Sequence, residues 1–382
     1  MLASLLLLFI SLFYWQRCNR TTTTTSDKPY LPPPEEDFKA ALFKWGYINT
    51  AGKMVIQPLF DEAGTFAEGL APVRVKGKWG YINKNGAVQI PFRFKGAWNF
   101  SGSLARVLTY DGKMGFIQPN GEWKIPPRYE NVSDFKNDRA LVQVGNYYGY
   151  IDRTGKMVVP HEFLKAFSFC DGLAVVGNES FNGLIDTGAN YIIPMEYDRI
   201  GIPKENRIAV RKGNLFGYFD YRGKLIIPFQ FNQAGEFNNG LAAVRKDSLY
   251  GLIRKDGSFF VKPAYHQISY AGSGLWIIEL NNKFGLLDKT GSILLSPEVD
   301  MLYQFSEGCA AYKSGDLWGF IDSTAALLTT PRYGLAWNFK EGLARVATSD
   351  GIGFIDRTGT LVIPPVFRDV RDFNQGLARA TQ

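Results

Sequence analysis

Histidine and cysteine are scarce in this chain of 382 residues, which contains two of the first and three of the second. The histidines, His161 and His266, are far apart in sequence, and no pair of residues has the spacing of metal ligands. Three cysteines are too few for a disulfide framework. The chain also has no Gly-x-Ser-x-Gly motif and no phosphate-binding loop. We therefore expect a protein that is not an enzyme and that uses no cofactor and no metal.

Clusters of basic residues are also missing. Lysine and arginine outnumber the acidic residues by 43 to 36, for a formal charge of +7, but they are scattered along the chain without a run. Nucleic-acid binding needs clustered positive charge that displaces counterions, so we expect no nucleic-acid partner. Apolar residues make up 46% of the chain, which is ample for a packed interior and excludes a disordered protein.

No apolar run reaches the roughly 20 residues of a typical membrane-spanning helix. Residues 2–15 are apolar and uncharged, and they are followed by Arg17, by the threonines 21–25 and by the prolines 32–34. We interpret residues 1–15 as an export signal or membrane anchor and residues 16–37 as a Thr/Pro-rich linker. The protein would then be exported or anchored at the cell envelope, touching the membrane only through this segment. A cytoplasmic protein with a misassigned start is the alternative, because residues 1–15 lack a basic start and an obvious cleavage site.

A glycine recurs about every 34 residues along most of the chain. Every gap is 34 residues except one of 35, so a single supersecondary unit is present in ten copies. A glycine within a strand marks a bulge or a close approach of another group. Because aromatic residues flank it in most copies, as in Trp45-Gly46-Tyr47, we expect a neighbouring ring to lie over its bare Cα. The repeated glycines are Gly46, Gly80, Gly115, Gly149, Gly183, Gly217, Gly251, Gly285, Gly319 and Gly353.

Each unit alternates apolar and polar residues with the period of two that is typical of strands with one buried face. In the second copy this pattern predicts three strands, over residues 70–75, 79–82 and 88–90. The turn before the third strand begins with Asp or Asn and ends with glycine, as in residues 152–155, which suits hairpin geometry. A proline follows, Pro91 in this copy, and is expected to end the strand because it cannot donate to the ladder. Each unit is thus predicted to be an antiparallel β-meander.

Taken together, these motifs resemble the WG or KWG β-repeat family of bacterial repeat proteins. The segments 44–48, 78–82 and 338–344 carry the resemblance most clearly, and it covers residues 38–382. Tryptophan is replaced in several copies, and residues 201–206 lack the aromatic anchor that precedes the first strand of other units. The resemblance implies a β-repeat scaffold and offers no shared activity.

The ends of the array bear on its overall shape. Residues 377–380 match the first strand of a unit whose Trp-Gly strand never follows, so they could complete the meander that begins at Trp45 and close a β-propeller-like ring. Terminal units that merely cap an open array are the other arrangement. Because ten blades would be unusual for a ring, we expect an all-β, open twisted solenoid of roughly 100 Å, with the closed ring as the alternative.

An aspartate begins the hairpin turn in six copies. Such a column of carboxylates could indicate a calcium site or a pair of catalytic carboxylates. Each copy contributes only one such residue, however, so we interpret the column as turn-capping residues. The aspartates are Asp152, Asp186, Asp220, Asp288, Asp322 and Asp356.

Four copies carry an aromatic residue two positions before the anchor phenylalanine, where most copies differ. These residues are Trp98, Phe167, Tyr303 and Trp337. They are candidate binding residues that could stack on sugar rings or anchor a protein partner, while packing between units is the other interpretation. We expect a non-catalytic scaffold for protein–protein interaction at or outside the cell envelope, with an unknown protein partner. The alternative is a module that binds cell-envelope glycans through exposed aromatics.

Overall fold

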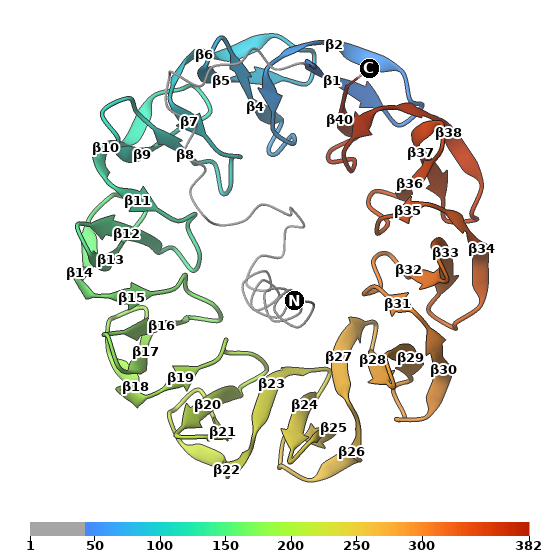
Figure 1. The fold of residues 1–382 in the computed structure, drawn as a ribbon. Coiled ribbons are helices and arrows are strands. Elements are labelled where there is room, and N and C mark those ends of the chain that lie inside the picture. Colours follow the sequence, from blue (N-terminus) through green and yellow to red (C-terminus); the bar gives the residue numbers. More distant parts are fainter. Residues whose placement is uncertain (1–42, 382) are drawn as a thin grey trace.

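The structure, a computed structural model, describes residues 43–381 and forms a closed ring of ten blades (Figure 1). Each blade is a four-stranded antiparallel sheet, so the prediction of ten β-meander units is confirmed. The segments assigned as signal or anchor and as linker, and the first residues of the array, lie outside the described residues. Along residues 43–381 no helix is long and apolar enough to cross a membrane.

Within a blade the strands follow one another from the inner to the outer side of the ring (Figure 1). The first and innermost strands are mostly two residues long: β3 (Glu62–Ala63), β7 (Gly96–Ala97), β11 (Asn131–Val132), β15 (Lys165–Ala166), β19 (Arg199–Ile200), β23 (Gln233–Asn238), β27 (Gln267–Gly272), β31 (Met301–Leu302), β35 (Leu335–Ala336) and β39 (Asp369–Val370). The second strands are β4 (Leu70–Val75), β8 (Ala105–Leu108), β12 (Ala140–Val144), β16 (Leu173–Gly177), β20 (Ile208–Lys212), β24 (Leu241–Lys246), β28 (Leu275–Leu280), β32 (Cys309–Ser314), β36 (Leu343–Thr348) and β40 (Leu377–Thr381).

The third strands carry the repeated glycine: β1 (Trp45–Asn49), β5 (Lys78–Asn83), β9 (Met114–Ile117), β13 (Tyr147–Ile151), β17 (Asn182–Asp186), β21 (Leu215–Phe219), β25 (Leu249–Arg254), β29 (Lys283–Leu287), β33 (Leu317–Asp322) and β37 (Gly351–Asp356). The fourth strands form the outer rim: β2 (Met54–Phe60), β6 (Val88–Phe94), β10 (Trp123–Tyr129), β14 (Met157–Phe163), β18 (Tyr191–Tyr197), β22 (Leu225–Phe231), β26 (Phe259–Tyr265), β30 (Ile293–Val299), β34 (Leu327–Tyr333) and β38 (Leu361–Phe367).

The open solenoid is wrong, because the two ends of the array share one sheet. Strand β40 pairs with β1 in antiparallel register, from Gly46 opposite Ala380 to Asn49 opposite Leu377. The sheet order is β2-β1-β40-β39, and we call this sheet the closing blade. Without β40 the strand β1 would leave a row of backbone donors and acceptors unpaired. Satisfying that edge within the chain outweighs the rarity of ten-bladed rings, which was the reason for expecting a rod.

Two details of the predicted meander also differ. The connecting segment contributes a short first strand, so the sheet has four strands instead of three. The proline does not end the outer strand: Pro91 lies in the middle of β6, and Phe94 still pairs with Trp79. Since the fourth strand is the outer edge of the blade, a residue without an N–H costs no ladder bond there and hinders another chain from adding to the edge.

The repeated glycine sits at a register shift between the third and fourth strands. A Cβ at Gly46 would lie 2.4 Å from the carbonyl oxygen of Ile56, and one at Gly115 would lie 2.5 Å from that of Ile125. The expected ring over the bare Cα is therefore wrong for most copies, since the close group is the backbone of the bulged partner strand. A ring does come close in three copies. The ring of Tyr191 is the nearest group to a Cβ at Gly183, at 3.0 Å, while the rings of Phe92 and Tyr312 would lie 2.7 Å and 2.9 Å from a Cβ at Gly80 and Gly319.

The core lies between neighbouring blades, where the aromatic residue after the glycine packs on the anchor phenylalanine of the next unit. Tyr47 and Phe66 have ring centroids 4.9 Å apart, and Tyr81 and Phe100 have centroids 5.1 Å apart. The Tyr81 hydroxyl also donates to the carbonyl of Trp98 in the next blade. Such buried ring pairs add about 0.5–1.5 kcal/mol beyond the area that they bury. At seven of the ten joints the blade is thus held to the next by the same pair of rings. At the other three joints the residue after the glycine is a leucine, Leu184, Leu252 or Leu286.

Cysteines contribute to this fold in two ways. Cys309 is a free, buried residue in the place that leucine takes in other copies, and burial raises the pKa of its thiol. It acts as a small core hydrophobe, as its position in the repeat predicts. Cys170 lies in the turn before β16 and forms a β-bridge with Leu173.

Candidate binding surfaces

The four aromatic candidates all lie just after the first strand of their blades, toward the inner side of the ring (Figure 1). Trp98 and Trp337 are half-buried, and each lies beneath an arginine of the second strand of its own blade. The guanidinium carbon of Arg106 is 5.3 Å from the ring centroid of Trp98, and that of Arg345 is 4.4 Å from that of Trp337. Part of the surface of both tryptophans is therefore covered by intramolecular cation–π contacts.

Phe167 and Tyr303 are more accessible. Phe167 is 45% exposed, whereas Tyr303 is 37% exposed and packs against Trp318 with ring centroids 4.7 Å apart. Partial burial raises the pKa of the Tyr303 hydroxyl. The four candidates do not form one patch, because each belongs to a different blade; only Tyr303 and Trp337 stand in adjacent blades.

A groove of about 180 Å³ is lined by one of these candidates, Phe167, and we call it the inner groove. It is lined by residues of three consecutive blades, among them Arg106, Asp134, Lys136, Tyr148 and Phe167. The Arg106 guanidinium, which stacks on Trp98, ion-pairs with Asp134 at 2.8 Å and donates to the carbonyl of Val132 at 3.0 Å. The inner groove thus combines one exposed ring, Phe167, and one half-buried ring, Tyr148, with Arg, Asp and Asn side chains.

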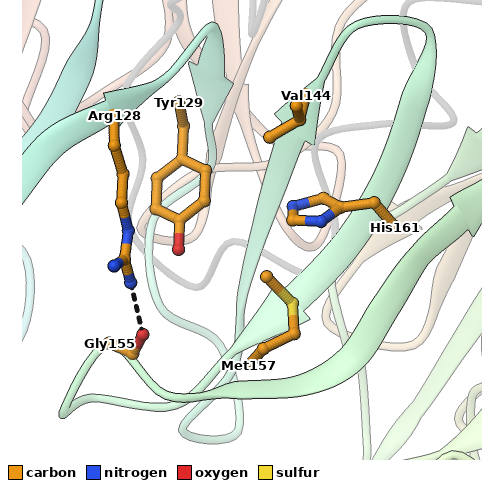
Figure 2. A pocket seen from close by; sticks show the side chains of 6 residues that line it. All are labelled: Arg128, Tyr129, Val144, Gly155, Met157 and His161. Atoms are coloured by element: carbon orange, nitrogen blue, oxygen red, sulfur yellow. Dashed lines mark hydrogen bonds between the residues drawn. The ribbon is translucent and has the colours of Figure 1, made fainter.

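A larger and more open hollow, of about 450 Å³, lies on the outer rim between β10 and β14 (Figure 2). Figure 2 shows Arg128 reaching the turn of the next blade, where its guanidinium donates to the carbonyl of Gly155 at 2.7 Å. The buried Nε2 atom of His161 has no hydrogen-bond partner. Burial, aided by the charge of Arg128, lowers the pKa of His161 and keeps the imidazole neutral at pH 7. With Arg128 already occupied, the hollow lacks the several convergent polar groups of a small-molecule site.

The aspartates of the hairpin turns accept hydrogen bonds from backbone N–H groups of their own turns. Oδ1 of Asp152 accepts hydrogen bonds from the N–H groups of Thr154 and Lys156 and from the Thr154 hydroxyl. That hydroxyl is the main cause of the lowered pKa of Asp152. Asp356 repeats this arrangement with Thr358 and with the N–H of residue 360. The turn interpretation of this column is therefore confirmed. Within residues 43–381, no group of three or more His, Cys, Asp or Glu side chains is placed to hold a metal ion.

An exposed aliphatic surface on the outer rim escaped the sequence reasoning, and we call it the rim patch. It consists of Val55 and Leu59 on β2 and of Val362 and Val366 on β38, with exposed fractions of 44%, 66%, 42% and 68%. The two strands are the outer strands of adjacent blades (Figure 1). A Cβ added to Gly52 of the closing blade would lie 2.8 Å from the side chain of Ile363 on β38, so the blades are in contact there.

The rim patch is a departure from the repeat. Leu59 and Val366 are the sixth residues of their strands, and the other fourth strands carry Arg93, Arg128, Glu162, Glu196, Gln230, Ala264, Glu298 and Arg332 at that place. Where the residue is arginine, its guanidinium donates to a glycine carbonyl in the turn of the next blade, as from Arg93 to Gly121 at 2.6 Å. Leu59 and Val366 cannot make that bond. Aligning the ten outer strands would have revealed the patch from sequence.

The fold is a ten-bladed β-propeller built from tandem repeats. The family model described as "WG containing repeat" matches residues 45–79, 79–113, 114–148, 148–179, 183–216, 216–250, 284–318, 318–350 and 352–382. The chain therefore belongs to the WG-repeat family, which confirms the resemblance found in its motifs. No curated protein matches the chain.

Several solved structures are similar in fold. A eukaryotic initiation factor is 13% identical over 84% of this chain and 95% of its own, with a TM-score of 0.47. The computationally designed Ika8 protein is 12% identical over 65% of this chain and 92% of its own, with a TM-score of 0.37. BamB from Moraxella catarrhalis is 12% identical over 60% of this chain and 80% of its own, with a TM-score of 0.33.

Proposed function

We propose that this protein is a non-catalytic scaffold that binds a protein partner through the rim patch, at or outside the cell envelope. The observation that carries the proposal is the exposure of Leu59 and Val366, which at 66% and 68% are the most exposed large hydrophobic residues of the described chain. Leaving such side chains in water on the outer strands of two adjacent blades is unfavourable by roughly 25 cal/mol for each Å² of apolar surface. Contiguous exposed apolar residues on a soluble fold mark an interaction surface.

The partner would dock through side chains and not by adding a strand. Pro58 interrupts β2, and Pro364 and Pro365 interrupt β38, so neither edge offers a continuous row of N–H donors. The envelope location rests on the apolar run of residues 2–15, which lies outside the described residues. The absence of catalysis is supported by the wide separation of His161, on β14, and His266, between β26 and β27.

The repeat itself supplies a variant that tests this function. Leu59→Arg with Val366→Arg installs the residue that Arg93, Arg128 and Arg332 provide elsewhere, so the fold should be kept while the patch becomes charged. A photo-crosslinking side chain at position 59 should give a specific adduct in cells, and the Val366→Arg substitution should weaken it. Gln230, at the equivalent place on β22, is the matched control position. Equal crosslinking from positions 59 and 230 would contradict the proposal.

Glycan binding is the second candidate, and the inner groove favours it. Phe167 is an exposed ring beside Arg106, Asp134 and Asn131, and an exposed ring flanked by such groups can stack on a sugar and hydrogen-bond to its hydroxyls. Titration of the purified protein with cell-envelope glycan fragments tests it. A loss of binding in Phe167→Ala with unchanged thermal unfolding is the expected result.

A further inference from the structure

We propose that the inner groove binds a sugar residue that carries a carboxylate, such as a uronate. This inference rests on the glycan-binding candidate and adds to it the class of sugar. It is independent of the rim patch, which lies on the opposite side of the blades.

The groove offers two rings to the face of a sugar. Phe167 follows β15 and is 45% exposed. Tyr148 lies on β13 of the preceding blade and is half-buried. The apolar C–H faces of a pyranose can cover such rings, and the volume of about 180 Å³ is below the roughly 300 Å³ at which sites for drug-sized ligands begin. The groove therefore suits a single sugar residue better than a folded peptide.

The polar side of the groove is held in place before any ligand arrives. Arg106 is fixed by the ring of Trp98, by the carboxylate of Asp134 and by the carbonyl of Val132, and only 11% of its side chain is exposed. A guanidinium immobilised in this way loses little conformational entropy on binding. Asn131 and Ser133 add hydrogen-bonding groups beside it.

The charge of the groove selects an acid. Arg106 is neutralised by Asp134, whereas Lys136 forms no ion pair with a carboxylate among residues 43–381. The lining residues therefore carry one uncompensated positive charge. A carboxylate on the sugar would meet the ammonium of Lys136 while its ring covers Phe167, and this pairing is stronger in a groove than in open water.

A second copy of the tryptophan–arginine–aspartate arrangement shows what the groove adds. Trp337 stacks with Arg345, whose Nε lies 2.6 Å from the carboxylate of Asp372. In the inner groove, Phe167 lies two blades after Trp98. The residue at the same position two blades after Trp337 is Gly64, which has no side chain. The arginine and aspartate thus recur without the exposed ring, so Phe167 distinguishes the inner groove from its structural copy.

The test is a calorimetric titration of the full chain with methyl glucuronide and, separately, with methyl glucoside. Saturable binding of the glucuronide is expected, weakened about tenfold by Phe167→Ala and about fivefold by Lys136→Ala, the latter effect shrinking as salt is raised. Phe181→Ala removes a ring of similar exposure, 43%, that does not line the groove; it is the control and should bind like the wild type. Thermal unfolding of each variant shows that it is folded.

Equal affinity for the neutral glucoside would overturn the acidic class and leave glycan binding standing. Failure of both sugars to bind would overturn both the class and the glycan candidate. Glucuronide binding that survives Phe167→Ala, or that falls equally in Phe181→Ala, would place the site elsewhere and overturn the inference as well.

Discussion

The side chain of Gln375 accepts a hydrogen bond of 3.0 Å from the backbone N–H of Gly69, 306 residues away in sequence. The bond joins the closing blade to the blade that contains β3 and β4. At other joints a glutamate at the same place in the unit accepts two such bonds; Oε1 and Oε2 of Glu341 receive the N–H groups of Gln375 and Gly376 at 2.5 and 2.8 Å. These residues adopt positive φ, near 52° for Glu341 and 54° for Gln375. The contact to the next blade offsets the cost of that conformation.

Replacing Gln375 tests how much this hydrogen bond contributes to the stability of the closed ring. Gln375→Ala removes the acceptor and should lower the free energy of unfolding by about 1 kcal/mol. Gln375→Glu places the residue of Glu341 at the closing joint and should match or exceed the wild type. Chemical denaturation measures both. Gln230→Ala, at an exposed position on β22, controls for the loss of a glutamine. An equal loss of stability in this variant would show that the hydrogen bond from Gly69 to Gln375 does not stabilise the ring.

Deleting residues 377–382 tests the closure itself. The shortened chain lacks β40, so the third strand β1 loses one of its two partners and the short β39 loses its only neighbour. We expect a loss of several kcal/mol in the free energy of unfolding and a larger radius of gyration in small-angle scattering. A chain ending at Thr381 keeps β40 and is the control. Unchanged scattering and stability after the longer deletion would contradict a ring closed by this pairing.

The repeated glycine is predicted to be intolerant of any side chain. Gly115→Ala would bring a Cβ to 2.5 Å from the carbonyl oxygen of Ile125 and should cost more than about 2 kcal/mol of stability. Gly334→Ala is the matched control, because its nearest atom is 3.7 Å away and its φ is not in the left-handed region; it should change stability by less than about 1 kcal/mol. Thermal unfolding compares the two, and a similar midpoint for both would refute the steric explanation.

The periodic features of this fold were predictable from sequence, and the non-periodic ones were not. Ten units, their hairpin turns and the aromatic anchors repeat, so each copy strengthens the evidence of the others. Ring closure depends on a single pairing, between β1 and β40. The sequences of these two strands are equally compatible with a closed ring and with the terminal caps of an open array. The repeated glycines were identified from the sequence, but the contact that requires them was not. A bulge depends on the register of the partner strand, which cannot be derived from the sequence of one strand.

The candidate surfaces follow the same logic. Phe167 was found because aromatic residues vary at its position, and the structure adds Arg106 and Lys136 from neighbouring blades, which sequence alone does not bring together. Leu59 and Val366 were missed because a lone aliphatic residue in a strand is read as core. Their exposure becomes visible only when the alternation of the outer strand is known.

Acid should destabilise the ring through its turn aspartates. Hydrogen bonds from threonine hydroxyls are the main cause of the lowered pKa of Asp152, Asp288 and Asp356. A carboxylate whose pKa is lower in the folded state stabilises the fold above its ordinary pKa near 3.9, and this contribution is lost as the pH falls through the folded value. The midpoint of thermal unfolding should therefore stay level near neutral pH and fall below about pH 4.

Asparagine can accept the same backbone bonds but does not titrate. The triple variant with Asp152, Asp288 and Asp356 changed to Asn should show a shallower fall of the unfolding midpoint between pH 4 and pH 2 than the wild type. A matched variant changes Glu298, which is exposed on β30, to Gln and should keep the wild-type slope. Identical slopes for the triple variant and the wild type would show that other carboxylates govern acid unfolding.

Trp98 and Trp337 are predicted to act in packing and not as the primary binding residues. Each covers an arginine, and Trp98 also packs against the core cluster of its blade. Changing both to alanine should lower the free energy of unfolding by about 2–5 kcal/mol in total, since the buried Arg345 would lose its ring while its ion pair with Asp372 remains. Phe167→Ala removes an exposed ring and serves as the comparison, with little change expected in the unfolding midpoint. If the double variant unfolds like the wild type but no longer binds a ligand, the two tryptophans belong to a binding site after all, because a packing residue cannot be removed without a cost in stability.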